Sequence, residues 1–144
     1  MGTFTSPAWP ARVDAALLIV RVASAVAFLY HGSAILFGVF GGPGPERFAA
    51  FMHQPTAIGY LVGLAEFAGG LAFLTGVLIR FGAVCIIVVM LGAIFLVHLP
   101  HGFDIGKGGI EYALTQLSIA LALLLTGPSA YSLRFLVPAK WRNR

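Results

Sequence analysis

The sequence predicts an all-α integral membrane protein in which four helices cross the bilayer as a bundle. Of the 144 residues, 59% are hydrophobic and only 10% are charged, whereas soluble domains carry about 25% charged residues. The mean hydropathy is +0.94. Four apolar segments, at about 15–38, 57–79, 81–99 and 111–127, approach the ~20 residues that a helix needs to cross hydrocarbon. We therefore expect residues 1–144 to form a single membrane domain.

The connection after the first segment is predicted to contain a short helix of its own. Its sequence, GGPGPERFAAFMHQPT, begins with glycines and prolines that end the first segment. Phe48, Phe51 and Met52 then fall on one helical face. Because a short helix with one apolar face lies in the plane of the membrane surface, we expect an interfacial helix in this first outer loop.

The later segments follow one another with shorter connections. Only the tripeptide RFG at 80–82 separates the second segment from the third, so we expect these two helices to be antiparallel neighbours. The third segment ends at Pro100 and is close to the short limit for a membrane crossing. The fourth opens at Glu111 and ends at Gly127 and Pro128, which stop a helix.

The positions of lysine and arginine predict the orientation in the membrane. Arg12, Arg80, Arg134, Lys140, Arg142 and Arg144 fall on one side of the four-helix arrangement, and Arg47 and Lys107 fall on the other. Since basic residues collect on the cytoplasmic side, both termini should be cytoplasmic.

The net charge is +4, but the basic residues are scattered. They indicate contacts with the lipid bilayer rather than with nucleic acid.

Glu66 is the most unusual residue of the second segment, because an acidic group in mid-membrane costs about 2.5–3.5 kcal/mol. The apolar residues of that segment offset this cost by roughly 3–7 kcal/mol, so the helix still inserts. Helical periodicity places four glycines on the face of Glu66, namely Gly59, Gly63, Gly69 and Gly70. Small residues permit close helix contacts, which turns Glu66 toward the interior of the bundle.

Arg21 is the expected partner of Glu66. Counting helical rise places the two residues roughly 7 Å apart along the membrane normal, within reach of an arginine side chain. In one interpretation a buried Arg21–Glu66 pair only holds two helices together. In the other, Glu66 is a carboxylate for proton transfer beside a ligand pocket. The two interpretations are compatible.

Further polar residues gather near the outer ends of the segments. His31, His98, His101, Asp104, Glu111, Thr115 and Ser118 could together form a polar funnel that leads down to Glu66. Each also has a simpler explanation, because histidines at an interface and a glutamate at a helix start are common. Haem is disfavoured, since His31 and His98 differ in depth by roughly 7–10 Å, and we expect no metal site.

The order of these motifs resembles the DoxX family of small bacterial membrane proteins. The likeness covers about residues 15–133 and is carried by FLYHG, GGPGPERFAAF, AEFAGGLAFLTGVLIRFGA, VMLGAIFLVHLPHGF, GGIEYAL and GPSAYSL. It implies a four-helix bundle in the cytoplasmic (inner) membrane of a bacterium. Family members are described as subunits of membrane redox systems, including thiosulfate:quinone oxidoreductase. The resemblance therefore implies a quinone as the electron acceptor.

The family pattern can be carried over position by position. It singles out Arg21, His31, Gly32, Glu66, Gly69, Gly70, Arg80, His98, Gly102, Glu111 and Tyr112. Among these, His31, Glu66, Gly69, Gly70 and Tyr112 are the implied contacts of a bound small molecule. One position departs from the family, which often has a lysine where this chain has Ile35. If that lysine binds an anionic substrate elsewhere, thiosulfate chemistry is less expected here.

The function expected from these observations is that of a redox subunit which binds a quinone or a similar apolar molecule in a polar pocket. Glu66 and Arg21 would form the floor of the pocket, and His31, His98 and Glu111 would exchange protons with the outer side. A protein partner would supply electrons. Two alternatives stay open: a non-catalytic scaffold or assembly factor, and a transporter of small molecules or lipids. The chain could also form a homo-oligomer.

Overall fold

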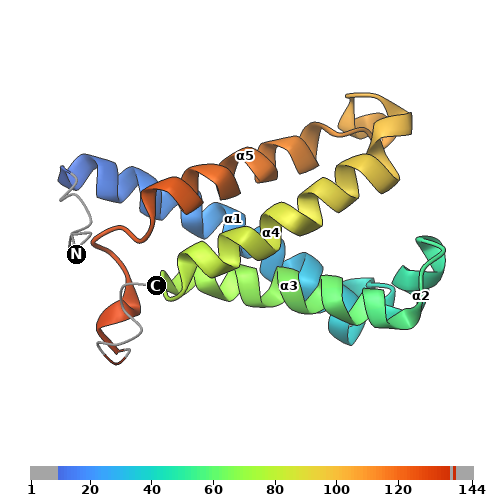
Figure 1. The fold of residues 1–144 in the computed structure, drawn as a ribbon, viewed down its shortest axis with the longest axis horizontal. Coiled ribbons are helices and arrows are strands. Elements are labelled where there is room, and N and C mark those ends of the chain that lie inside the picture. The colour runs from blue at the N-terminus through green and yellow to red at the C-terminus, as the bar shows by residue number, and fades with distance from the viewer. Residues whose placement is uncertain (1–9, 137, 139–144) are drawn as a thin grey trace, which may run out of the picture.

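The computed structural model describes residues 10–136 and 138, and all regular secondary structure in this part of the chain is helical. The helices are α1 (Ala11–Phe37), α2 (Gly44–Phe51), α3 (Thr56–Thr75), α4 (Ile79–Ala93) and α5 (Glu111–Thr126) (Figure 1). A π turn at Ile94–His98 and a 3₁₀ turn at Leu99–His101 extend α4. The all-α prediction is therefore confirmed over the described residues.

Three of the helices are long and apolar enough to cross a membrane. They are Ala11–Phe37, Thr56–Thr75 and the extended α4, Ile79–His101, with 27, 20 and 23 residues. The fourth predicted crossing corresponds to α5, which is apolar but has only 16 residues. At about 1.5 Å per residue it is shorter than a bilayer core of about 30 Å. The chain is a multi-pass membrane protein, and the fourth crossing stays a prediction.

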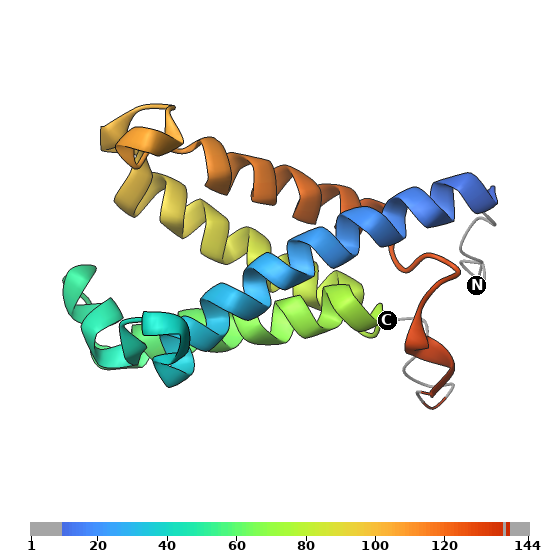
Figure 2. The same cartoon turned by 180° about the vertical axis from the view of Figure 1, so that it is seen from behind.

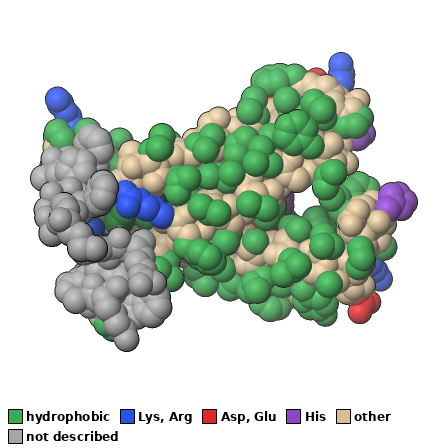
Figure 3. Space-filling model, viewed as in Figure 1, with side chains coloured by type: hydrophobic (Ala, Val, Ile, Leu, Met, Phe, Trp, Pro, Cys, Tyr) green, Lys and Arg blue, Asp and Glu red, His purple; other side chains and the backbone are tan. Residues whose placement is uncertain are grey.

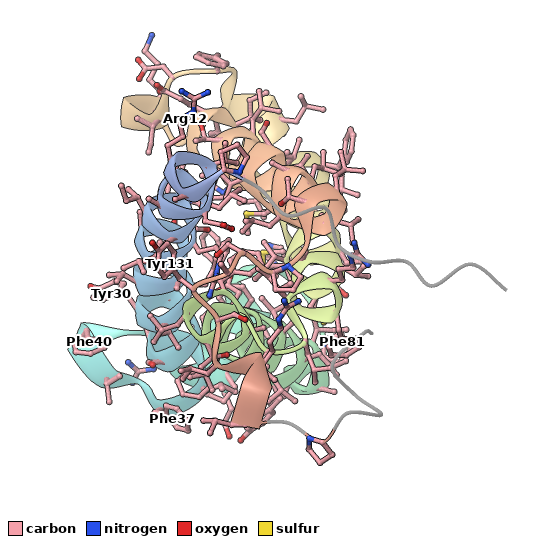
Figure 4. The ribbon with its side chains drawn as sticks, turned by 90° about the vertical axis from the view of Figure 1, so that its left-hand side faces the viewer. Arg12, Tyr30, Phe37, Phe40, Phe81 and Tyr131 are labelled. Carbon is pink, nitrogen blue, oxygen red and sulfur yellow. The ribbon has the colours of Figure 1, made fainter. Side chains whose placement is uncertain are left out.

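Exposed apolar side chains cover the outer faces of these helices (Figure 3). Tyr30, Phe37 and Phe40 lie on one side of the molecule and Phe81 on the other, and all four are exposed (Figure 4). In water such surfaces would be costly, because each apolar Å² costs about 25 cal/mol. The bilayer removes that cost, so these faces are the lipid contacts of the protein.

The helices form two arms that meet at one end and separate at the other. α3 and α4 are joined by a tight turn, and α4 and α5 then run together away from α3 (Figure 1). α1 lies along α3 and crosses toward α5 near the end of the molecule that holds the turn (Figure 2). The core sits at this crossing, where Phe28, Phe73, Ile86 and Leu123 are fully buried.

The turn between α3 and α4 differs from the sequence prediction. We expected the connection at 80–82, but α3 ends at Thr75, with Gly76 as its cap, and α4 begins at Ile79. Gly76 adopts the left-handed conformation with φ 73°, which closes the last turn of α3. Gly82 instead lies inside α4, against Ala72. The prediction that the two helices are antiparallel neighbours is confirmed.

Two other predicted features are found. The first connection contains α2, although its position on the membrane surface stays a prediction. α5 ends where expected, since Gly127 with φ 70° follows its last residue. Lys140, Arg142 and Arg144, which contributed to the predicted orientation, lie outside the described residues, and the orientation stays a prediction.

Glycines bring α1 and α3 into close backbone contact. A Cβ atom placed on Gly32 would lie 2.5 Å from the backbone nitrogen of Phe67. One placed on Gly70 would lie 3.0 Å from the nitrogen of Leu29 and 3.2 Å from the carbonyl oxygen of Ala25. Because these atoms belong to backbone, they cannot rotate away. The two helices therefore meet at backbone distance, as the glycine-rich face of the second segment predicts.

Replacing Gly32 by alanine tests this contact. We expect Gly32→Ala to lower the free energy of unfolding by roughly 1–3 kcal/mol, because the added methyl group must push α1 away from α3. Thermal unfolding in mild detergent, followed by circular dichroism, measures the effect.

Gly92→Ala is the matched control, because Gly92 is also helical but has nothing within 4 Å of its Cβ position. Its stability should be unchanged or raised by up to about 1 kcal/mol. Equal effects of the two substitutions would contradict the backbone contact at Gly32.

Candidate functional site

Glu66 lies inside the bundle, and one oxygen of its carboxyl group has no hydrogen-bond partner among the described residues. It stands in the middle of α3, its side chain is only 7% exposed, and its Oε2 atom is buried and unpartnered. A buried polar atom without a partner costs free energy, and a carboxylate costs more than most. The side chain of α3 whose burial costs the most free energy is therefore left with an oxygen that accepts no hydrogen bond.

A second unpartnered group, the hydroxyl of Tyr112, lies at the same level of the bundle. Tyr112 is the second residue of α5, and its hydroxyl oxygen is buried. α1 brings the two groups together, because the His31 ring lies 5.9 Å from the Tyr112 ring while the adjacent Gly32 touches the backbone of Phe67. Tyr112 lies close to Glu66 and to the side-chain amide of Gln116, although no hydrogen bond of good geometry forms to its hydroxyl among the described residues. The pair lies between α1, α3 and α5.

His31 connects this pair to the open end of the molecule. It is exposed, and its ring packs edge-on against Tyr30 at 5.5 Å and near Tyr112 at 5.9 Å. Figure 3 shows the surface hollowed between the arm of α4 and α5 and the arm of α2 and α3. His31 thus offers an ionisable group between the exterior and the unpartnered oxygens.

Arg21 does not pair with Glu66, so that prediction is wrong. Its guanidinium is fully buried and donates to the carbonyl oxygens of Phe73 (2.8 Å), Leu74 (3.2 Å) and Tyr131 (3.0 Å) and to Ser129 Oγ (2.9 Å). The last carbonyls of a helix have no intrahelical partner and attract a cation. Arg21 satisfies two of these carbonyls on α3, about two turns away from Glu66.

Several buried polar residues near Arg21 were not singled out from the sequence. Asp14 Oδ1 accepts a hydrogen bond of 2.8 Å from the backbone nitrogen of Ala130, and Ser24 Oγ donates to Gln116 Oε1 at 2.7 Å. On α1, residues 14, 21, 24 and 31 fall on one face because they are separated by seven, three and seven positions. That spacing was the available signal for Asp14 and Ser24.

The other residues of the predicted funnel serve the loop before α5. His98 Nδ1 lies 2.6 Å from the carbonyl oxygen of Gly108, and Glu111 Oε2 accepts from the backbone nitrogen of Ile105 at 3.1 Å. Thr115 and Ser118 donate to carbonyls of their own helix. The structure therefore joins His31 and Glu66 through Tyr112, while the described contacts of His98 and Glu111 are with loop backbone.

Gly69 and Gly70 lie beside Glu66 but are occupied by packing. The side chain of Ile86 lies 2.7 Å from a Cβ placed on Gly69, and α1 backbone closes over Gly70. The two glycines thus allow α4 and α1 to pack closely beside Glu66, and they leave no open space for a ligand at their own positions. Over residues 10–136, no group of three His, Cys, Asp or Glu side chains is placed to hold a metal ion.

Comparisons with known proteins agree on the kind of protein. The family model described as DoxX matches residues 16–99. "Inner membrane protein YqjF" of Escherichia coli (strain K12) is 32% identical over 131 residues, which cover 89% of this chain and 96% of that protein. "Putative oxidoreductase CatD" of Bacillus subtilis (strain 168) is 29% identical over 106 residues, 74% of this chain and 76% of that protein. No solved structure matches significantly.

The hydrogen bonds of Arg21 predict a large structural effect of its removal. Arg21→Leu should lower the free energy of unfolding by roughly 2–4 kcal/mol, because it leaves buried acceptors of α3 and of residues 129–131 unsatisfied. The loss is measured by thermal unfolding in detergent.

Arg12→Gln, on an exposed position of the same helix, is the control and should change stability by less than about 0.5 kcal/mol. An Arg21→Leu protein as stable as this control would overturn the structural role of Arg21.

Proposed function

This chain belongs to the DoxX family of membrane proteins, and we propose that it is a redox subunit which binds a quinone-type ring within its helices. The observation that carries the proposal is the pair of buried, unpartnered oxygens of Glu66 and Tyr112. A bound ring with oxygen substituents would give both of them hydrogen-bond partners. Without a ligand, burying these two oxygens lowers the stability of the bundle. Such a local loss of stability is typical of a binding site.

The surroundings of the two oxygens suit such a ring. Glycines of α3 flank Glu66, and apolar or glycine surroundings with a few converging polar groups are typical of small-molecule sites. The Ser24–Gln116 hydrogen bond and the Arg21 network close the far end. The ring would therefore enter from the open end between the two arms.

Each residue then has a role in this proposal. Glu66 and Tyr112 hold the ring oxygens, and His31 exchanges protons between the site and the exterior. His98 and Glu111 hold the loop at the open end, where they would also exchange protons with the outer side. Arg21 and the packed glycines Gly69 and Gly70 would position α3, and thereby Glu66, rather than touch the ring.

The proposal includes a membrane topology. α5 would be the fourth crossing, both termini would be cytoplasmic, and α2 would lie on the outer membrane surface. Residence in the bacterial inner membrane is supported by the name of the Escherichia coli relative. In this orientation the open end of the bundle and His31 face outward.

Electrons would come from a protein partner. The printed name of the Bacillus subtilis relative supports an oxidoreductase system. Ile35 occupies the position where many family members have lysine, and it is buried against the Gly63 face of α3. An anionic substrate such as thiosulfate therefore finds no cation at that position, so we propose only the quinone half of the chemistry.

Extraction of bound molecules tests the proposal. Full-length protein purified from bacterial membranes in mild detergent should carry a quinone that mass spectrometry detects after solvent extraction. Glu66→Gln and Tyr112→Phe should retain at least about fivefold less of it, because each removes a hydrogen bond to the ring.

Tyr60→Phe, at an exposed tyrosine of α3, is the matched control and should retain the wild-type amount. If the wild-type protein carries no quinone, binds none when it is added, and Glu66→Gln folds normally without any change, the redox proposal fails. A non-catalytic scaffold or assembly factor would then be the better description.

A further inference from the structure

We propose that the side-chain amide of Gln116 donates the hydrogen bond that binds one carbonyl oxygen of the ring, and that Ser24 is a positioning residue which fixes the orientation of this amide. The inference rests on the proposed function and adds the group that recognises the ring. It starts from the hydrogen bond that joins α1 to α5, in which Ser24 Oγ donates to Gln116 Oε1 at 2.7 Å.

The hydroxyl of Ser24 bonds differently from four other hydroxyls of the helices. Each of those four donates to the carbonyl oxygen four residues earlier in its own helix; they belong to Thr75, Thr115, Ser118 and Thr126. The same bond within α1 is open to Ser24. Its hydroxyl donates to α5 instead, and both partners are buried, with 1% of Ser24 and 8% of Gln116 exposed. A side chain of α5 is thus held in place from another helix.

This bond determines which end of the Gln116 amide faces the site. A primary amide has an acceptor oxygen on one branch and a donor nitrogen with two protons on the other. Because the oxygen is held at Ser24, the nitrogen is directed away from Ser24. Tyr112 precedes Gln116 by one helical turn on the same face of α5, and its hydroxyl is close to the amide. The nitrogen therefore lies on the side of Tyr112, which is also close to Glu66.

The amide nitrogen complements the two titratable groups of the site. It keeps its protons in the folded protein at any pH, whereas the carboxyl group of Glu66 and the hydroxyl of Tyr112 can each gain or lose one. Among the described residues, the hydrogen bond of good geometry that this amide makes is the one to its oxygen. A ring carbonyl only accepts hydrogen bonds, so the nitrogen of Gln116 suits it. Glu66 and Tyr112 then stay available for proton exchange.

A purely structural tie between α1 and α5 is the simpler explanation of the Ser24–Gln116 bond. The two explanations differ in what they predict for a bound ring. A hydrogen bond to a carbonyl oxygen weakens the C=O bond and lowers its stretching frequency. A tie between helices affects the stability of the protein and leaves that frequency unchanged.

Infrared spectroscopy of the bound ring tests the proposal on the full-length protein in mild detergent. The probe is a short-tailed benzoquinone, and the difference between samples with and without isotope-labelled carbonyl carbons isolates the carbonyl bands. In the wild type, at least one band should lie at a lower frequency than in an apolar solvent. Gln116→Met keeps a similar volume and removes the donor. It should move that band to higher frequency and weaken binding of the ring roughly three- to tenfold.

Ser24→Ala tests the positioning role with a smaller change. It leaves Gln116 in place but frees the amide to turn, so the lowered band should lose intensity and shift toward higher frequency. Ser118→Ala is the matched control, because Ser118 is exposed and bonds within its own helix. It should keep the wild-type spectrum. Should Gln116→Met fail to fold, the comparison of Ser24→Ala with Ser118→Ala decides the result.

The outcomes separate this inference from the proposed function. If the ring binds to the wild type with carbonyl bands as in an apolar solvent, or if the folded Gln116 and Ser24 variants keep the wild-type bands, the inference is overturned and quinone-ring binding stands. If only Gln116→Met shifts the band, the positioning role of Ser24 is overturned. If the wild type binds no ring, the inference and the proposed function fail together.

Discussion

The glycine contact between α1 and α3 is the constraint on which the rest of the structure depends. Gly32 lies on the backbone of Phe67, and Gly70 lies on the backbone of α1. This register sets Arg21 against the end of α3 and sets His31 beside Tyr112 of α5. If α1 and α3 were farther apart, or shifted along one another, Arg21 would no longer reach the end of α3. His31 would no longer lie beside Tyr112.

Arg21 and Glu66 show two opposite uses of a charge inside a membrane protein. Arg21 is fully buried, and its guanidinium donates hydrogen bonds to carbonyls at the end of α3 and to the segment after α5. Glu66 is almost as buried, yet one of its oxygens has no partner. The first arrangement is complete without a ligand. The second is not, and an unsatisfied polar group in a well-packed interior calls for a functional explanation.

Much of the fold could be predicted from the sequence, because apolar length and glycine spacing act locally. The long helices, the helix in the first connection and the inward glycine face of α3 all follow from such patterns. The partner of Arg21 could not be predicted in the same way. It depends on the end of α3 at Thr75, capped by Gly76, and on the return of residues 129–131 to the bundle. Helical rise alone predicts neither. Tyr112 came from the family resemblance, whereas Gln116 carried no signal in the sequence beyond its polarity.

Under the proposed function, Glu66 serves a ligand and contributes nothing to the stability of the empty bundle. The most direct measurement is the unfolding free energy of ligand-free Glu66→Met, which has a similar volume and no unpaired oxygen, against the ligand-free wild type. We expect the variant to be as stable as the wild type or more stable, by up to about 2 kcal/mol, because a buried unsatisfied group is removed. A loss of about 2 kcal/mol or more, the size expected when a buried polar tie is broken, would contradict the claim.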